Sequence, residues 1–107
     1  MLAFPSNDFN QELDTNAEIL QYVNDHFPEV EFPIFSRGSL ADSEVFKLCK
    51  EMTGESVRWN FHKYLVNGRG EAVKSYGHRI QPMAIEEDIV ALLKENDGVR
   101  HPKPVVM

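Results

Sequence analysis

Residues 58–66 of the chain read Arg-Trp-Asn-Phe-His-Lys-Tyr-Leu-Val, and the turn-forming residues Asn67-Gly68-Arg69-Gly70 follow directly. A second run able to form a strand, residues 72–76, comes next. Asn-Gly pairs favour the positive φ angles of tight hairpin turns, so this arrangement is a strong hairpin signal. Bulky side chains alternate onto both faces of the first run, which is typical of a strand inside a sheet. We therefore predict a β-hairpin of residues 61–66 and 72–76, with its first strand in the sheet interior.

Three helices are predicted around this hairpin. Thr15 and Glu18 have the spacing of a capping box, and apolar residues then recur every four positions until a proline ends the helix. A second helix is expected to start within residues 39–42 and to end at Gly54, and a third to follow Pro82. The apolar faces predicted for these helices are, in chain order, Ile19, Val23 and Phe27; Val45, Cys49 and Met52; and Ile85, Ile89, Leu92 and Leu93.

Two further strands are expected from short apolar runs that contain or precede a proline. Leu2–Phe4 is predicted to be a buried strand ended by Pro5, and residues 32–35 an edge strand. A buried strand needs neighbours on both sides, so we expect Leu2–Phe4 to leave a hydrophobic sheet edge exposed and the isolated chain to aggregate or fold only partly. Residues 97–107 contain one glycine and two prolines and are expected to form a flexible tail. The predicted order is β-α-β-α-β-β-α, an α/β layered domain with a partly antiparallel sheet.

The composition is that of an ordinary folded chain and argues against several classes of function. The chain has 107 residues, enough for one domain, of which 42% are hydrophobic and 26% are charged. A formal net charge of −6 argues against a nucleic-acid partner. No apolar run approaches the ~20 residues of a membrane span, and the first residues lack the basic region of a signal peptide. Cys49 is the single cysteine, which excludes an internal disulfide and a zinc site with several thiolates.

Two polar segments far apart in the sequence, residues 4–12 and 58–66, carry the clearest candidates for a functional site. Gln11, Trp59 and Asn60 each provide a neutral N–H donor, and none of them is a nucleophile or a base. Such a set can hold an anion, a thiolate or a peroxide oxygen, but it does no covalent chemistry by itself. The reactive group must therefore come from another residue.

These two segments resemble motifs of the glutathione peroxidase family. That family has a strand ending in Phe-Pro-Cys-Asn-Gln-Phe, followed shortly by Gln-Glu, where this chain has Phe4–Glu12, and later Trp-Asn-Phe-x-Lys-Phe-Leu-Val, where it has Trp59–Val66. Two multi-residue motifs at a fitting separation make a specific match, which extends over roughly residues 2–95. The resemblance implies a thioredoxin-like three-layer α/β sandwich that is N-terminally truncated, with residues 1–96 a partial domain and residues 97–107 the tail.

The resemblance also implies an activity and a role for each candidate residue. In that family a cysteine or selenocysteine reduces hydrogen peroxide or organic hydroperoxides in the response to oxidative stress. The family's glutamine, tryptophan and asparagine fall on Gln11, Trp59 and Asn60, which would support the chalcogen anion as hydrogen-bond donors. Glutathione or thioredoxin is implied as reducing co-substrate, without a bound cofactor or metal. The parent protein is expected to be a cytoplasmic monomer with no nucleic-acid or membrane partner.

The chain departs from the family where the reactive residue is expected. The family's nucleophile lies at a strand-to-helix turn upstream of the first motif, and residues 1–107 do not include it. Ser6 stands at the family's nearby cysteine, and Asn24 stands where thioredoxin-using members place a resolving cysteine. We therefore expect a fragment or partial gene model that is inactive alone, so whether the chain is an enzyme stays open. The alternative is a catalytically inactive short form that acts as a binding or regulatory module, and a peroxidase that recruits Cys49 is a remote third.

The remaining reactive side chains have simpler explanations. Cys49 lies on the apolar face of a predicted helix, away from the cationic settings that activate thiols, so we expect a buried structural cysteine. His62 is expected to be a packed or edge histidine, and the four histidines lack the spacing of metal ligands. Four basic residues either form a weak patch for a γ-glutamyl thiol or are ordinary solvated charges. They are Lys63, Arg69, Lys74 and Arg79.

Overall fold

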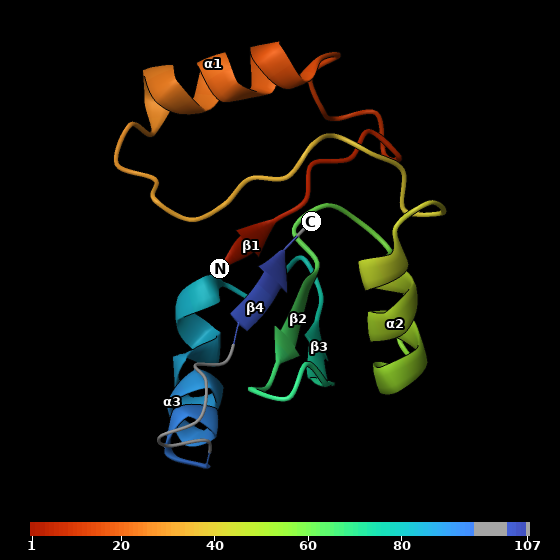
Figure 1. The fold of residues 1–107 in the computed structure, drawn as a ribbon, viewed down its shortest axis with the longest axis vertical. Helices are drawn as coiled ribbons and strands as arrows, with labels where there is room; N and C mark the ends of the chain where they lie inside the picture. The colour runs from red at the N-terminus through yellow and green to blue at the C-terminus, as the bar shows by residue number, and fades with distance from the viewer. Residues whose placement is uncertain (96–102, 107) are drawn as a thin grey trace.

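The computed structural model describes residues 1–95 and 103–106 of the chain. Within those residues it forms a mixed sheet with helices around it (Figure 1). In Figure 1, α2 and α3 flank the sheet on its two sides, and α1 stands apart from it. The elements in chain order are β1 (Leu2–Ala3), α1 (Asn16–His26), α2 (Glu44–Thr53), β2 (Lys63–Val66), β3 (Ala72–Tyr76), the 3₁₀ turn η1 (Pro82–Ile85), α3 (Glu86–Glu95) and β4 (Lys103–Val106).

The sheet has the strand order β1-β4-β2-β3 among the described residues. Strands β2 and β3 form the predicted antiparallel hairpin, with Tyr64 opposite Ser75. Strand β4 runs parallel to β1, pairing Val105 with Leu2, and antiparallel to β2, pairing Val105 with Tyr64. The hairpin and the interior place of its first strand are thus confirmed.

The hairpin turn is held by the side chain of Asn67. Its Oδ1 atom accepts hydrogen bonds from the backbone N–H groups of Arg69 and Glu71, both at 3.0 Å. Gly70 adopts φ 84°, a conformation that is costly for a residue with a Cβ atom. These local contacts explain why the Asn-Gly signal predicts the turn correctly.

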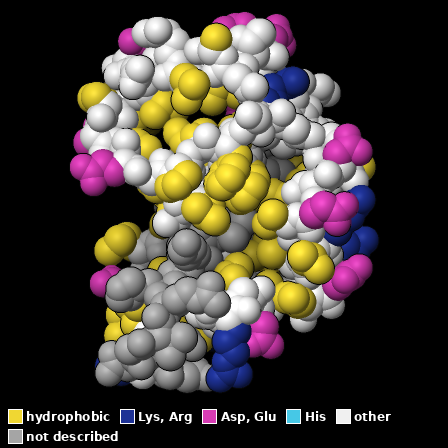
Figure 2. Space-filling view, viewed as in Figure 1, with side chains coloured by type: hydrophobic (Ala, Val, Ile, Leu, Met, Phe, Trp, Pro, Cys, Tyr) yellow, Lys and Arg dark blue, Asp and Glu magenta, His cyan; other side chains and the backbone are white. Residues whose placement is uncertain are grey.

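Helix α1 begins where the capping box predicts. Thr15 is its N-cap, and the Thr15 Oγ1 atom accepts a hydrogen bond from the Glu18 backbone N–H at 3.1 Å. The predicted apolar face is only partly covered, because Ile19 is buried while Phe27 remains about half exposed. Figure 2 shows hydrophobic side chains gathered across the middle of one face of the molecule, below the position of α1 in Figure 1.

Helix α2 ends at Gly54 as predicted, but it begins at Glu44, later than the expected start within residues 39–42, and it has a different buried face. Ser43 caps its start, and Gly54, at φ 74°, ends it in the left-handed conformation. Phe46 and Cys49 are buried, whereas the expected Val45 and Met52 are exposed. The buried face is therefore turned by one position, because Phe46 packs against aromatic rings on the sheet side.

The core lies between α2 and the sheet. Tyr64 on β2 is its largest fully buried side chain, 0% exposed, and it packs with Phe46, Cys49 and Ala72. Leu65, the next residue, is also fully buried, on the opposite face of the strand. The ring of Phe46 lies 6.0 Å from that of Tyr64 and meets the ring of Phe4 edge-on at 5.3 Å. Phe4 thus carries the N-terminal strand into the same core as the hairpin.

Three predictions about the strands are corrected by the structure. Residues 32–35 form no strand; Ile34 makes an isolated parallel bridge to Ala3, with the Phe35 N–H donating to the Ala3 carbonyl at 2.8 Å. Residues 103–106 of the expected tail are strand β4, while residues 96–102 and 107 lie outside the described part of the chain. Ala3 therefore has partners on both sides, β4 and Ile34, so the expected open sheet edge is not present. The observed order is β-α-α-β-β-α-β.

Candidate functional site

Gln11 lies in a loop that follows β1 and is held by short-range hydrogen bonds. The side chain of Asn7 accepts from the Glu12 backbone N–H at 3.0 Å, and the Asn10 N–H donates to the Asn7 carbonyl at the same distance. Asn10 has φ 58°, a left-handed conformation that asparagine tolerates better than most residues. This sharp turn determines the direction in which the Gln11 side chain extends from the backbone.

The same loop is tied to the segment before α2 through Asp8. The Asp8 carboxylate accepts from the hydroxyl of buried Ser6 at 2.5 Å and from the Leu40 backbone N–H at 2.7 Å. Ser6, at the place of the family's cysteine, is therefore used as a hydrogen-bond donor inside the loop. This gives Ser6 and Asp8 a structural role.

Trp59 and Asn60 lie just before β2 and are followed by a second left-handed residue. Phe61 has φ 61° although it is bulky, and its side chain is 67% exposed. A non-glycine residue of this kind is an outlier that costs of the order of 1–3 kcal/mol and is often found near functional sites. The turn at Phe61 determines how Asn60 is presented beside β2.

The structure brings Gln11 and Asn60 into direct contact, and Trp59 joins the same two segments through Phe9. The Asn60 Nδ2 amide donates a hydrogen bond to Gln11 Oε1, joining segments 49 positions apart. The ring of Phe9 packs against the Trp59 indole, with centroids 5.2 Å apart and an interplanar angle of 41°. We refer to Gln11, Trp59 and Asn60 as the donor set.

Donor groups of this set remain available for a ligand. Among the described residues, the Trp59 indole N–H and the Gln11 Nε2 amide donate to no protein atom. Trp59 is 42% exposed, so part of the residue is open to solvent or to a small molecule. The hydrogen bond from Asn60 occupies the Gln11 oxygen and so leaves the Gln11 amide N–H atoms for other acceptors.

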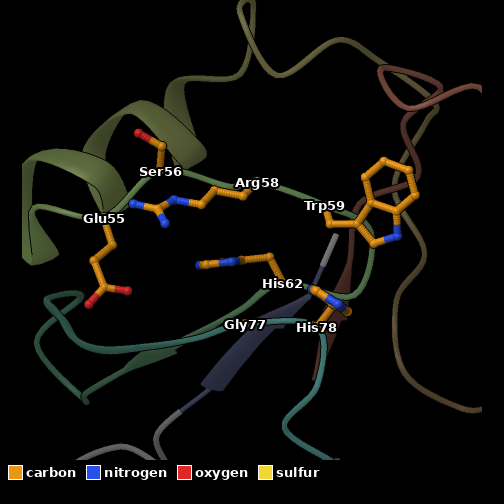
Figure 3. A pocket seen from close by; sticks show the side chains of 7 residues that line it. All are labelled: Glu55, Ser56, Arg58, Trp59, His62, Gly77 and His78. Carbon is orange, nitrogen blue, oxygen red and sulfur yellow. The ribbon is translucent and has the colours of Figure 1, made fainter.

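A pocket of about 630 Å³ lies next to Trp59 (Figure 3). In Figure 3, the side chains of Glu55, Arg58 and His62 extend into one part of it, and the Trp59 indole points away from them. Trp59 is the member of the donor set that lines this pocket, and Gln11 and Asn60 do not line it. Its lining residues are Glu55, Ser56, Arg58, Trp59, His62, Gly77 and His78.

His62 is a packed side chain, as the sequence predicts. It is buried, its Nε2 atom lies 2.6 Å from Ser75 Oγ, and its ring lies 4.7 Å from that of Tyr64. Burial lowers the pKa of His62, with Glu55 acting in the opposite direction. The neutral imidazole is therefore the favoured form at neutral pH.

Cys49 is also buried as predicted, being 4% exposed on the inner face of α2. Burial raises the pKa of its thiol, which keeps the thiol protonated and unreactive at neutral pH. Cys49 is therefore unsuited to act as the nucleophile. The part of the chain that the structure describes also has no group of three His, Cys, Asp or Glu side chains able to hold a metal ion.

Sequence reasoning missed Phe9 and the two left-handed residues. Phe9 supports the Trp59 indole, and its place inside the first polar segment was the only available signal. The left-handed turns at Asn10 and Phe61 flank Gln11 and Asn60 directly, and an ordinary phenylalanine gives no sign of one. The fold and the site together define a small α/β domain with a neutral donor set between two loops.

Comparison with curated proteins shows what this domain is similar to. The chain is 37% identical over 101 residues to a probable phospholipid hydroperoxide glutathione peroxidase 6, mitochondrial, of Arabidopsis thaliana, covering 87% of this chain and 43% of that protein. It is 35% identical to a probable phospholipid hydroperoxide glutathione peroxidase of Citrus sinensis, covering 88% and 60% of the two chains. A chloroplastic phospholipid hydroperoxide glutathione peroxidase of Pisum sativum is 38% identical, with 87% and 42% covered. The chain is a homologue of the glutathione peroxidases, which confirms the resemblance.

The chain spans about half the length of these curated relatives. No protein-family model matches it. The names of two of the relatives place those proteins in mitochondria or chloroplasts, so the comparison gives no support to the expected cytoplasmic location. In the described residues, no helix has the length and apolar character needed to cross a membrane.

Proposed function

We propose that this chain carries the hydrogen-bond donor side of a thiol-dependent, peroxide-reducing site of the glutathione peroxidase type. The observation that supports this most is the contact between Gln11 and Asn60 beside the partly exposed Trp59. Two loops far apart in sequence meet there, and they leave neutral N–H groups pointing to solvent. Such donors favour an anionic chalcogen or a peroxide oxygen over a positively charged ligand.

The proposed chemistry assigns each residue of the donor set a separate task. A thiolate or selenolate attacks one peroxide oxygen, the O–O bond breaks, and a sulfenic or selenenic acid forms with release of an alcohol or water. Two reducing thiols, from glutathione or thioredoxin, then return the acid to the thiolate or selenolate as water and a disulfide leave. The Trp59 indole and the Gln11 amide donate to the anion, and Asn60 holds the Gln11 amide in position.

The nucleophile of this reaction is not among residues 1–107. Cys49 is the only cysteine, and it is buried and protonated. We therefore propose that the 107-residue polypeptide, whether a fragment or a partial gene product, shows no thiol-dependent peroxide reduction above a Cys49→Ser control. Robust turnover that disappears in Cys49→Ser would contradict this.

A complementation experiment tests the donor role directly. The chain is refolded with a polypeptide covering the part of the Pisum sativum relative that it does not match, and peroxide reduction is followed with glutathione and with thioredoxin. The matched control pairs that polypeptide with the relative's own remaining half. Activity with this chain that falls at least tenfold in Gln11→Ala and Asn60→Ala supports the proposal. If the control pair is active and this chain restores nothing, the proposal is wrong.

A second candidate, a catalytically inactive binding or regulatory module, is favoured by one observation. Ala3 is paired on both sides, by β4 and by Ile34, so the N-terminal strand has sheet partners within this chain. A monomer with a sharp, reversible thermal transition that stays inactive in the complementation experiment would favour this candidate. Loss of the folded state in isolation would count against it.

The fold, the oligomeric state and the compartment of the chain are also open to proposal and test. We propose a thioredoxin-like, three-layer arrangement, which the mixed sheet and the packing of α2 against β3 support. We propose a monomer, which sedimentation analysis of the purified chain tests. The compartment is best tested by imaging, with cytoplasm, mitochondria and chloroplasts as the outcomes to be separated.

A further inference from the structure

Strand β4 is the element that joins the two halves of the sheet. It pairs with β1 on one side and with β2 on the other, so that Val105 is in register with Leu2 and with Tyr64. In the sheet order, β4 separates the N-terminal strand from the hairpin. The gap between β1 and β2 is thus a slot one strand wide, with backbone pairing groups on both of its walls.

The present occupant of this slot is poorly suited to it. Pro104 lies within β4, opposite Leu65, and proline has no N–H to donate to a neighbouring strand. Proline within sheets is otherwise confined to edge strands, strand starts and bulges. The residue before Lys103 is also a proline. A strand of the same length without proline would therefore form a more complete set of hydrogen bonds in this position.

The walls of the slot define which strand fits best. The incoming strand must run parallel to β1 and antiparallel to β2, as β4 does. On β2, the side chains of Tyr64 and Leu65 are buried, so strand neighbours with apolar side chains are favoured. The outer side of Ala3 is already paired with Ile34, which leaves the position of β4 as the place where a strand meets both walls.

We propose that the slot between β1 and β2 is an acceptor site for an extended, apolar, proline-free strand of another polypeptide, which replaces Lys103–Val106. Recognition of this kind rests on main-chain hydrogen bonds along the ladder, with side-chain pairing giving specificity. The inference depends on the sheet alone and holds whether or not the donor set takes part in peroxide reduction.

The test uses the full chain and a synthetic peptide. The peptide has the sequence of residues 101–107 with Pro102→Val and Pro104→Val, and carries a fluorophore for anisotropy measurements. Its affinity should be about tenfold higher than that of the native-sequence peptide, because ladder hydrogen bonds are regained. A matched control peptide, N-methylated at the positions of Val105 and Val106, has the same side chains without those donors and should not bind.

Hydrogen exchange identifies where the peptide binds. On binding, the amides of Val105 and Val106 in the protein should lose protection at least tenfold, while those of Lys63–Val66 keep theirs. Binding that leaves the Val105 and Val106 amides protected would place the peptide elsewhere, for instance on the outer edge of β3, and would overturn the proposal. Equal binding of the N-methylated control would overturn it as well.

A variant that weakens the internal strand keeps the test decisive. Val105→Pro removes a further N–H from β4, so the full-length variant should bind the peptide more tightly than the unchanged chain. If this variant is unfolded, the peptide should restore its far-UV circular dichroism spectrum. Binding to the variant alone supports the proposal, since the internal strand then outcompetes the peptide in the unchanged chain. Absence of binding to both proteins, or of any restored structure, overturns it.

Discussion

Replacing Tyr64 by phenylalanine should destabilise the chain at neutral pH and stabilise it at strongly alkaline pH. Tyr64 is fully buried, and its hydroxyl donates a hydrogen bond to the Glu55 carbonyl oxygen at 2.6 Å. Burial raises the pKa of Tyr64 to about 12, and the nearby Cys49 and Glu55 act in the same direction. The substitution removes both the hydrogen bond and the ionisable group.

The two effects have opposite signs and comparable sizes. At pH 7 the lost hydrogen bond should lower the free energy of unfolding by about 1 kcal/mol, since the Glu55 carbonyl loses its partner. The folded-state pKa lies above the unfolded value of about 10, so the protonated hydroxyl stabilises the fold fully below pH ~10. That stability is lost as the pH rises through the folded pKa, and the loss reaches about 2 kcal/mol at pH ~12. The stabilities of the two proteins should therefore cross near pH ~11.

Urea unfolding followed by circular dichroism between neutral pH and pH ~11.5 measures this crossing. Tyr22→Phe is the matched control for removal of a tyrosine hydroxyl, because Tyr22 is about half exposed on α1. Other groups that titrate in this range are common to all three proteins and cancel in the comparison. Unfolding curves of Tyr64→Phe and the unchanged chain that stay parallel up to pH ~11.5 would refute the reasoning.

Three further predictions concern the residues around the site. Phe61→Gly should raise the free energy of unfolding, measured with urea, by up to about 1 kcal/mol, because glycine tolerates φ 61° without strain. The control Phe27→Gly, at φ −137°, should lower the free energy of unfolding. Changes of the same sign in both variants would contradict the strain argument. A double-mutant cycle of Gln11→Ala and Asn60→Ala should give a coupling of about 0.5 kcal/mol for their exposed hydrogen bond, and strict additivity would mean that the contact contributes nothing. Cys49 should react with a thiol reagent at least about tenfold more slowly in the folded chain than in urea. Burial shields the thiol from the reagent and raises its pKa. Equal rates in the two conditions would show that α2 opens freely.

The elements predicted correctly from the sequence are those with local signals. Thr15 and Glu18 lie within one helical turn of each other, and Asn67 binds the backbone two and four residues away. Each of these sequence signals therefore forms its contacts with residues close to it in the chain. The buried face of α2 depends instead on which side the sheet approaches. Phe46 is drawn inward by Phe4 and Tyr64, which the periodicity of the helix alone does not reveal.

Strand β4 could not be predicted for the same reason. Lys103–Val106 has the proline content of a tail, and it becomes a strand through pairing with residues about 40 and 100 positions earlier. Ile34 shows the converse, because an apolar run with a proline yields a single bridge. For the site, motif and residue type led to Gln11, Trp59 and Asn60, and the structure supplies their contacts. The backbone strain at Phe61 leaves no trace in the sequence.

The pairing of Leu2 with Val105 has a consequence for how the chain folds during synthesis. The hairpin and the helices are local and can form within microseconds once they emerge. β1, in contrast, gains this sheet neighbour only when the residues of β4, about 100 positions later, leave the ribosome. At 5–20 residues per second, this interval is roughly 5 to 20 s. For that time the apolar residues of β1 have no sheet neighbour on this side, and chaperones that hold extended apolar segments have their best opportunity to bind them.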